Sequence, residues 1–118
     1  MQAETSYPAI IGRVLERHRK EAGYDQGNIA EALGLTQSAW SRIERGQSGL
    51  SFEYLVKFCE ILNTEPHKII EDADYAAKKI KANGVVVNPH VITNTDKVVA
   101  ILSLAALGAM IFTILSKK

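Results

Sequence analysis

Residues 29–46 read IAEALGLTQSAWSRIERG, and this stretch decides the fold. Apolar residues recur at helical spacing up to Leu33, and the Gly34 that follows is typical of a helix end. Thr36 is a good N-cap for a second helix, which Gly46 ends. Two helices joined by about three residues that include a glycine are the signature of a helix-turn-helix motif.

Helical signals continue on both sides of this stretch. Capping residues, prolines and glycines divide the first 82 residues into five helical segments, each with an apolar face. The predicted helices begin near Pro8, Asp25, Thr36, Ser51 and Pro66, and they end near Gly23, Gly34, Arg45, Leu62 and Ala82. We therefore predict an all-α, five-helix domain over residues 7–82.

A linker is predicted over residues 83–96. It contains two β-branched runs, 85–87 and 91–93, on either side of Pro89. These runs favour a mostly extended tether, and a small hairpin is the alternative. An isolated hairpin is only marginally stable in water, which favours the tether.

Charge is nearly balanced along the chain. The 118 residues contain 14 Lys and Arg against 13 Asp and Glu, and Tyr7–Ile70 holds eight of each. Because the domain is neutral overall, affinity for a polyanion has to come from the local placement of a few basic side chains. The N-terminus lacks a basic start followed by an apolar run, so we expect no signal peptide and a cytoplasmic domain.

Catalytic and metal-binding patterns are missing from the sequence. Cys59 is the single cysteine and lies on the apolar face of its predicted helix, so we expect a buried thiol and no disulfide. His18, His67 and His90 are too scattered for a metal site. No nucleophile with a base and no paired carboxylates stand out. We expect no enzymatic activity and no cofactor.

The C-terminal segment 97–118 differs from the rest of the chain. Val98 to Leu115 are 18 consecutive uncharged residues, 15 of them hydrophobic, and as a helix they have no polar stripe. Lysines flank the run on both sides, with more on the N-terminal side, which favours that side in the cytoplasm. We therefore predict a single transmembrane helix that anchors the chain in the inner membrane, with the lipid bilayer as a partner. The alternative is a core formed by the tails of several copies.

Three stretches of the sequence together indicate a protein family more specifically than the turn between the two helices does alone. They are IGRVLERHRKEAGYDQ at 11–26, IAEALGLTQSAWSRIERG at 29–46 and LSFEYLVKFCEILN at 50–63. Residues 11–70 resemble the Cro/C1-type (XRE) helix-turn-helix family of phage repressors and bacterial regulators. The resemblance covers about half the chain, and it implies five helices, double-stranded DNA as partner, a third helix in the major groove and a homodimer.

The resemblance also implies which residues touch DNA. Side chains of the third helix would face base edges or the adjacent backbone, and Gln and Arg have the geometry to bond adenine and guanine bidentately. Others would hold phosphates near helix ends. The candidate DNA-binding residues are Gln26, Thr36, Gln37, Ser38, Ser41, Arg42, Arg45, Gln47 and Ser48.

Several of these residues also have a structural interpretation. The polar residues of the third helix can be a solvated face, and Arg42 can form an ion pair with a neighbouring acid. Trp40 is three residues before Ile43, which predicts that it packs in the core, and Glu44 is predicted to be structural by its family position. The basic residues of the first helix, including Arg19, are interpreted as a solvated face with one phosphate contact.

The leading hypothesis is a sequence-specific, membrane-tethered transcriptional regulator of the repressor type. Two other classes of protein fit the same features. One is a membrane-anchored scaffold similar to the cell-shape protein RodZ, in which the helix-turn-helix domain binds a protein partner. The other is a soluble antitoxin-like regulator whose tail mediates oligomerisation or binds a partner protein.

Overall fold

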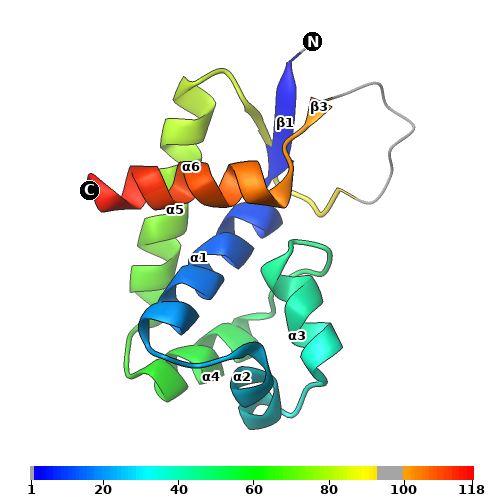
Figure 1. The fold of residues 1–118 in the computed structure, drawn as a ribbon, viewed down its shortest axis with the longest axis vertical. Helices are drawn as coiled ribbons and strands as arrows, with labels where there is room; N and C mark the ends of the chain where they lie inside the picture. The colour runs from blue at the N-terminus through cyan, green and yellow to red at the C-terminus, as the bar shows by residue number, and fades with distance from the viewer. Residues whose placement is uncertain (1, 93–99) are drawn as a thin grey trace.

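The computed structural model describes residues 2–92 and 100–118. Within these ranges the chain forms six helices and three short strands (Figure 1). In chain order the elements are β1 Ala3–Ser6, α1 Tyr7–Glu21, α2 Gln26–Leu33, α3 Gln37–Glu44, α4 Phe52–Leu62, α5 Pro66–Ala82, β2 Val86–Asn88, β3 Ala100–Ile101 and α6 Leu104–Ser116. The five helices predicted for residues 7–82 are confirmed.

Side-chain caps fix where most of the helices begin. A side-chain oxygen of the residue before the helix accepts a hydrogen bond from the backbone N–H three residues later, a contact that contributes about 0.5–2 kcal/mol per helix. This holds for α1, α2, α3, α4 and α6, whose caps are Ser6, Asp25, Thr36, Ser51 and Ser103. The cap of α2 is reciprocal, because the Asn28 side chain accepts the Asp25 N–H in return.

Helix α1 lies at the centre of the fold. Its buried residues Ile10, Val14 and Leu15 pack among residues from α2 to α5. Trp40 of α3 is fully buried, and its ring stacks on Phe58 of α4 with centroids 5.4 Å apart. The core position predicted for Trp40 is therefore confirmed, and α3 is attached to the domain through a large aromatic side chain.

The strands correct the all-α prediction. They form one small parallel sheet in the order β2-β1-β3, with Glu4 opposite both Val86 and Ile101. Residues 86–88 of the predicted linker therefore pair with the start of the chain, and the predicted hairpin partner at 91–93 forms no strand in residues 91–92, while residue 93 lies outside the described ranges. Strands of two to four residues carry too little alternation to be seen in the sequence.

The tail does not form the predicted membrane anchor. The helix starts only at Leu104 and has 13 residues, and Ala100–Ile101 form β3, while residues 98 and 99 lie outside the described ranges. Thirteen residues span about 20 Å, short of a hydrocarbon core of about 30 Å. None of the described helices is long and apolar enough to cross a bilayer. The prediction of anchoring in the inner membrane is therefore wrong, and nothing in the described residues supports a lipid partner.

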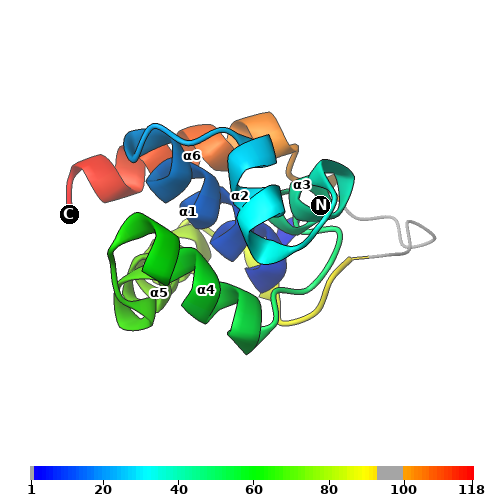
Figure 2. The same cartoon turned by 90° about the horizontal axis from the view of Figure 1, so that it is seen from below.

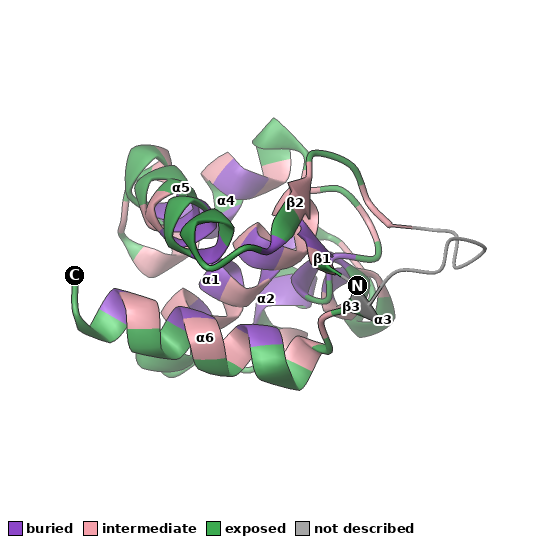
Figure 3. Cartoon of the chain, turned by 90° about the horizontal axis from the view of Figure 1, so that it is seen from above, coloured by how far each residue is buried: buried purple, intermediate pink, exposed green. Residues whose placement is uncertain are grey.

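Helix α6 instead packs across α1 and α5 (Figures 1 and 3). Leu107, Ile111 and Leu115 recur every four residues and are buried. This spacing gives one apolar stripe along the helix. The prediction failed because the uncharged run was assumed to find too little protein to cover it, whereas α1 and α5 offer a surface for one of its faces.

An ion-pair cluster joins the end of α6 to α5 and α1. Lys118 Nζ lies 2.6 Å from Asp72 Oδ1 and 3.0 Å from Glu71 Oε1, and His18 Nε2 lies 2.8 Å from Asp72 Oδ2. Burial by itself raises the pKa of Asp72, but the hydrogen bonds and charges of Lys118 and His18 outweigh burial and lower it. The ionised form of Asp72 therefore favours the packed position of α6.

We expect this cluster to make stability depend on pH in acid. A carboxyl group with a lowered pKa stabilises the fold above its ordinary value of 3.8, and that contribution is lost as the pH falls through its folded value. At neutral pH, Asp72→Asn should lower the free energy of unfolding by at most about 1 kcal/mol, because the pairs are partly exposed. Urea titrations at several pH values measure this free energy, and the difference between the variant and the native chain should vanish in strong acid. A difference that persists there would contradict the stabilising role of the ionised Asp72 carboxylate.

Candidate nucleic-acid interface

The turn between α2 and α3 is held by backbone hydrogen bonds. Gly34 adopts the left-handed conformation with φ 72°, and its N–H donates to the Glu31 carbonyl at 3.1 Å. The Leu35 N–H donates to the Ala30 carbonyl at 2.8 Å, and the Thr36 side chain then caps α3. A residue with a Cβ is strained at this φ, so a glycine suits the position. The predicted helix-turn-helix is confirmed.

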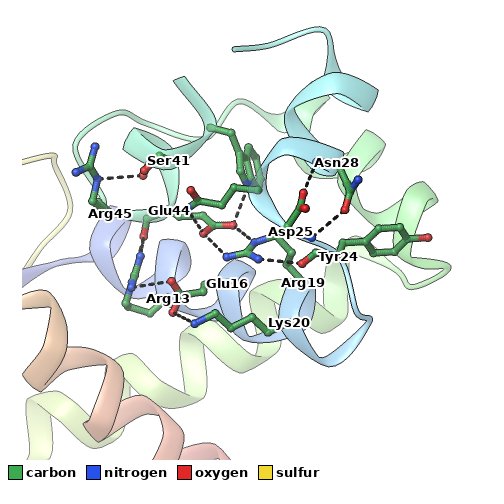
Figure 4. Close-up of polar contacts among 12 residues, drawn as sticks. Arg13, Glu16, Arg19, Lys20, Tyr24, Asp25, Asn28, Ser41, Glu44 and Arg45 are labelled. Carbon is green, nitrogen blue, oxygen red and sulfur yellow. Dashed lines mark hydrogen bonds and ion pairs between the residues drawn. The ribbon is translucent and has the colours of Figure 1, made fainter. Parts of the chain in front are cut away.

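The carboxylate of Glu44 fixes the inward face of α3. It is fully buried and accepts four hydrogen bonds, from Arg19 Nε at 2.6 Å, Arg19 Nη2 at 3.0 Å, Trp40 Nε1 at 2.7 Å and Gln26 Nε2 at 2.9 Å. The donors come from α1, α2 and α3 itself (Figure 4). Because both carboxylate oxygens are satisfied, the charge is compensated although it is out of water.

Arg19 is therefore not on a solvated face, and that prediction is wrong. Its side chain is 6% exposed and forms a two-pronged ion pair with Glu44, while Nη1 donates to the Tyr24 carbonyl at 2.9 Å. Burial lowers the pKa of Arg19, but the hydrogen bonds and charge of Glu44 outweigh burial and raise it. One signal in the sequence points to this position, since Arg19 follows the buried Leu15 by one helical turn.

A second contact fixes the C-terminal end of α3 on α1. Arg13 donates to the backbone carbonyl of Glu44 through Nε at 3.1 Å and Nη2 at 2.6 Å, where a helix end needs donors. Beside it, Gly12 is buried, and a Cβ at this glycine would overlap the Glu44 carbonyl and lie 2.7 Å from the Ile43 carbonyl oxygen. The backbones of α1 and α3 thus touch directly.

The outward face of α3 is polar and accessible. Thr36, Gln37, Ser38 and Arg42 are exposed, and Ser41 is half-buried. The Arg42 guanidinium donates to Ser38 Oγ at 3.1 Å. In the described part of the chain Arg42 forms no ion pair, so the alternative of a structural pair for this residue is not supported.

The loop after α3 continues this surface. Arg45 is exposed, and its Nε donates to the Ser41 carbonyl at 3.4 Å. Gln47 is exposed and Ser48 is half-buried, and the backbone N–H groups of both donate to the Arg42 carbonyl, at 2.9 and 3.3 Å. Their backbone donors are therefore occupied, which leaves the side chains to meet a ligand.

Gln26 is the candidate residue with an unexpected internal contact. It is half-buried at the start of α2, and one N–H of its amide is directed to Glu44. An amide nitrogen carries two hydrogens, so one donor remains for a second partner. Gln26 is thus held against the buried carboxylate while part of its surface stays exposed at the start of α2, which lies beside α3 (Figure 2).

Comparisons with known proteins agree with this architecture. The family model of a helix-turn-helix domain matches residues 10–69. The HTH-type transcriptional regulator SinR of Bacillus licheniformis is 33% identical over 66 residues, or 55% of this chain and 60% of its own length. SinR of Bacillus subtilis (strain 168) is 33% identical over 64 residues, or 53% and 58%. The chain thus matches about 60% of the length of these relatives.

Two solved structures share the fold. Both are crystal structures of the clp gene regulator ClgR from Corynebacterium glutamicum. One is 23% identical, with a TM-score of 0.63 over 67% of this chain and 84% of its own. The other is 24% identical, with a TM-score of 0.56 over 59% and 91%. Together with the matching family model and the geometry of α2 and α3, these findings show that the chain belongs to the Cro/C1-type helix-turn-helix family of DNA-binding domains.

Proposed function

We propose that the chain is a transcriptional regulator that recognises specific double-stranded DNA sequences through the outward face of α3, laid in the major groove. One observation carries the proposal. The inward face of α3 is fixed by Trp40 and by the four donors on Glu44, while its outward face presents polar side chains to solvent. A rigid helix with a free polar face is what base-edge recognition requires.

The exposed side chains divide into two roles. Gln37 and Arg42 read base edges, with adenine and guanine as the bases that suit them, and Ser38 and Ser41 contact bases or the adjacent backbone. The remaining side chains hold phosphates on either side and so set the register of α3. These are Gln26, Thr36, Arg45, Gln47 and Ser48. For Gln26, the amide hydrogen not used by Glu44 is the donor to phosphate.

Two further points support a regulator. The SinR relatives are named as transcriptional regulators, and their similarity lies in the part of the chain that contains α1 to α5. Because this domain has no net charge, non-specific attraction to a polyanion is weak, which favours recognition of DNA through a few specific contacts. We therefore propose that the protein binds as a homodimer, since two copies double the number of such contacts.

The proposal is tested by the salt dependence of binding. Duplexes enriched from a random library are labelled, and their binding to the full chain is followed by fluorescence anisotropy at several salt concentrations. Each phosphate contact releases counterions, so the logarithm of affinity should fall linearly with the logarithm of salt, with a slope of about −0.9 per contact. A protein that enriches no duplex, or that binds with no salt dependence, is not a DNA regulator of this kind.

Arg42→Ala should weaken binding to the enriched duplex by about 1–3 kcal/mol, because it removes a guanidinium that reads a base. The matched control is Arg17→Ala, which removes the same charge from α1, where Arg17 pairs with Glu21 at 3.0 Å. The control should bind nearly as well as the native chain in the same anisotropy assay. Equal affinities for Arg42→Ala and the native chain would remove Arg42 from the interface.

A further inference from the structure

The side chain of Arg13 contacts both α3 and α6. It lies on α1 and is only 10% exposed although it is charged. Its Nε and Nη2 donate to the backbone carbonyl of Glu44, at the end of α3 (Figure 4). Helix α6 reaches the same side chain, since a Cβ added at Gly108 would lie 3.8 Å from Arg13 Cδ. Arg13 thus links the C-terminal helix of the chain to the helix-turn-helix.

The contact with Glu44 fixes the last turn of α3. The carbonyls at a helix end have no partner within the helix, and they form the negative end of its dipole. A guanidinium that donates two N–H groups there makes a strong, charge-assisted contact. The same turn carries Arg42, whose own carbonyl accepts the N–H groups of Gln47 and Ser48. The direction of the proposed DNA contacts at this end of α3 therefore depends on Arg13.

Helix α6 strengthens this contact by keeping water away from it. Leu107 and Ile111 of α6 are buried, and Ile111 lies beside Arg13. A hydrogen bond that exchanges freely with water contributes little, and the same bond shielded from water contributes more. If α6 left α1, the guanidinium would be exposed, and water would compete with it for the Glu44 carbonyl.

We propose that α6 positions the DNA-binding end of α3 through Arg13, so that the packing of the C-terminal helix sets the affinity of the chain for DNA. Arg13 is a positioning residue and not a DNA contact, because all three of its guanidinium nitrogens donate within the domain, to Glu44 and to Glu16. The inference rests on the proposed function, in which this end of α3 contacts DNA.

The packing between α1 and α6 is incomplete. A hollow of about 250 Å³ lies between the two helices, and its lining includes Arg13, Gly108, Ile111 and Phe112. Phe112 is 64% exposed, and its ring lies 5.3 Å from the guanidinium carbon of Arg17. Atoms beside an empty space lose the dispersion contacts that a filled interface would provide. Displacing α6 therefore costs less than displacing a helix packed on all sides, which suits a helix whose position controls another.

The first test is a double-mutant cycle in DNA binding. The affinity for the enriched duplex is measured by fluorescence anisotropy for the native chain, Ile111→Glu, Arg13→Ala and the double variant, all as full chains. Ile111→Glu places a charge against α1 and displaces α6. Each single variant should bind about 10-fold more weakly, as the loss of charge-assisted hydrogen bonds predicts. The double variant should bind no more weakly than Arg13→Ala, because α6 acts through that side chain.

The matched control is Ala109→Glu, which adds the same charge to the exposed face of α6 and should bind as the native chain does. Circular dichroism shows whether each variant is folded. If Ile111→Glu is unfolded, Ile111→Ala replaces it, with a smaller loss in the same direction. Losses that multiply in the double variant, native affinity in the folded Ile111 variant, or an equal loss in Ala109→Glu each overturns the proposal.

Amide hydrogen exchange without DNA separates this inference from the proposed function. In Ile111→Glu, exchange should be about 10-fold faster at the N–H groups of Arg45, Gly46 and Gln47, which donate to carbonyls of α3. Exchange at the Leu35 N–H, in the turn between α2 and α3, should not change, whereas a general loss of stability would accelerate both and overturn the proposal. Faster exchange at 45–47 in a chain that enriches no duplex retains the coupling and refutes the regulator. Salt-dependent DNA binding with unchanged exchange at 45–47 retains the regulator and refutes the coupling.

Discussion

Arg19→Ala is expected to lower the free energy of unfolding by about 3–5 kcal/mol, the range for removing one partner of a buried ion pair. Glu44 is fully buried, and two of its four hydrogen bonds come from Arg19. Without the guanidinium, Glu44 keeps only neutral donors from Trp40 and Gln26 and must either remain charged in the interior or take up a proton. Urea unfolding followed by the fluorescence of Trp40 measures the loss.

Arg17→Ala is the control for this prediction, because it removes an arginine two residues away on the same helix. Arg17 pairs with the exposed Glu21, and its guanidinium lies 5.3 Å from the centroid of the Phe112 ring. A surface pair of this kind contributes about 0–1 kcal/mol. Similar losses in the two variants would show that the Arg19–Glu44 pair does not hold α3.

Gly12→Ala should destabilise the fold by about 1–3 kcal/mol, the usual cost of overpacking a core. The added Cβ would meet the carbonyl oxygens of Ile43 and Glu44, and these are backbone atoms that cannot rotate away. Helices α1 and α3 must therefore separate, so we also expect weaker DNA binding. Thermal unfolding and anisotropy report the two effects.

The control for Gly12→Ala is the same substitution at Gly27, inside α2. There the nearest atoms to an added Cβ are Asp25 Oδ1 at 3.4 Å and Gln37 Oε1 at 3.8 Å, which are ordinary contacts. Alanine is favoured over glycine in a helix interior by up to about 1 kcal/mol, and Gly27 is the second residue of α2, so Gly27→Ala should stabilise the fold by less than that amount. We expect the two substitutions to change the free energy of unfolding in opposite directions. Changes in the same direction would show that α1 and α3 are not in close backbone contact.

Local chemistry made the helices predictable from the sequence. Thr36 and Ser51 stand directly before apolar periodic segments, and Gly34 stands directly after one, so each boundary is decided by its neighbours. The burial of Trp40 followed from its spacing to Ile43 for the same reason. The places of the candidate contact residues on and around α3 could also be predicted from the sequence, because they follow from the motif and the helical period.

Contacts between distant segments were not predictable in this way. The spacing of Arg19 from Leu15 indicates an inward position, but its pairing with Glu44 depends on how α1 crosses α3, which the sequence does not show. The strand β1 forms because β2 and β3 reach it from the other end of the chain, and its own residues, AETS, carry no strand pattern.

The packing of the C-terminal segment 97–118 was also not predictable from the sequence. Its lack of a polar stripe is real, but the sequence does not reveal that α1 and α5 leave room for the face with Leu107, Ile111 and Leu115. Hydropathy predicts that an apolar segment is buried, and the surrounding fold decides whether lipid or protein buries it. In the described residues, protein covers one face of α6, and Ala105, Ala109 and Phe112 of the same helix are exposed.

Sequence selection with the native chain and with Arg42→Ala tests most directly whether the outward face of α3 reads DNA. Both proteins are used to enrich duplexes from the same random library, and the preferred base at each position is compared. The account predicts that the native chain enriches a defined sequence containing a guanine at one position of each half-site, and that Arg42→Ala loses the preference at that position alone. Identical preferences at every position for both proteins would contradict it.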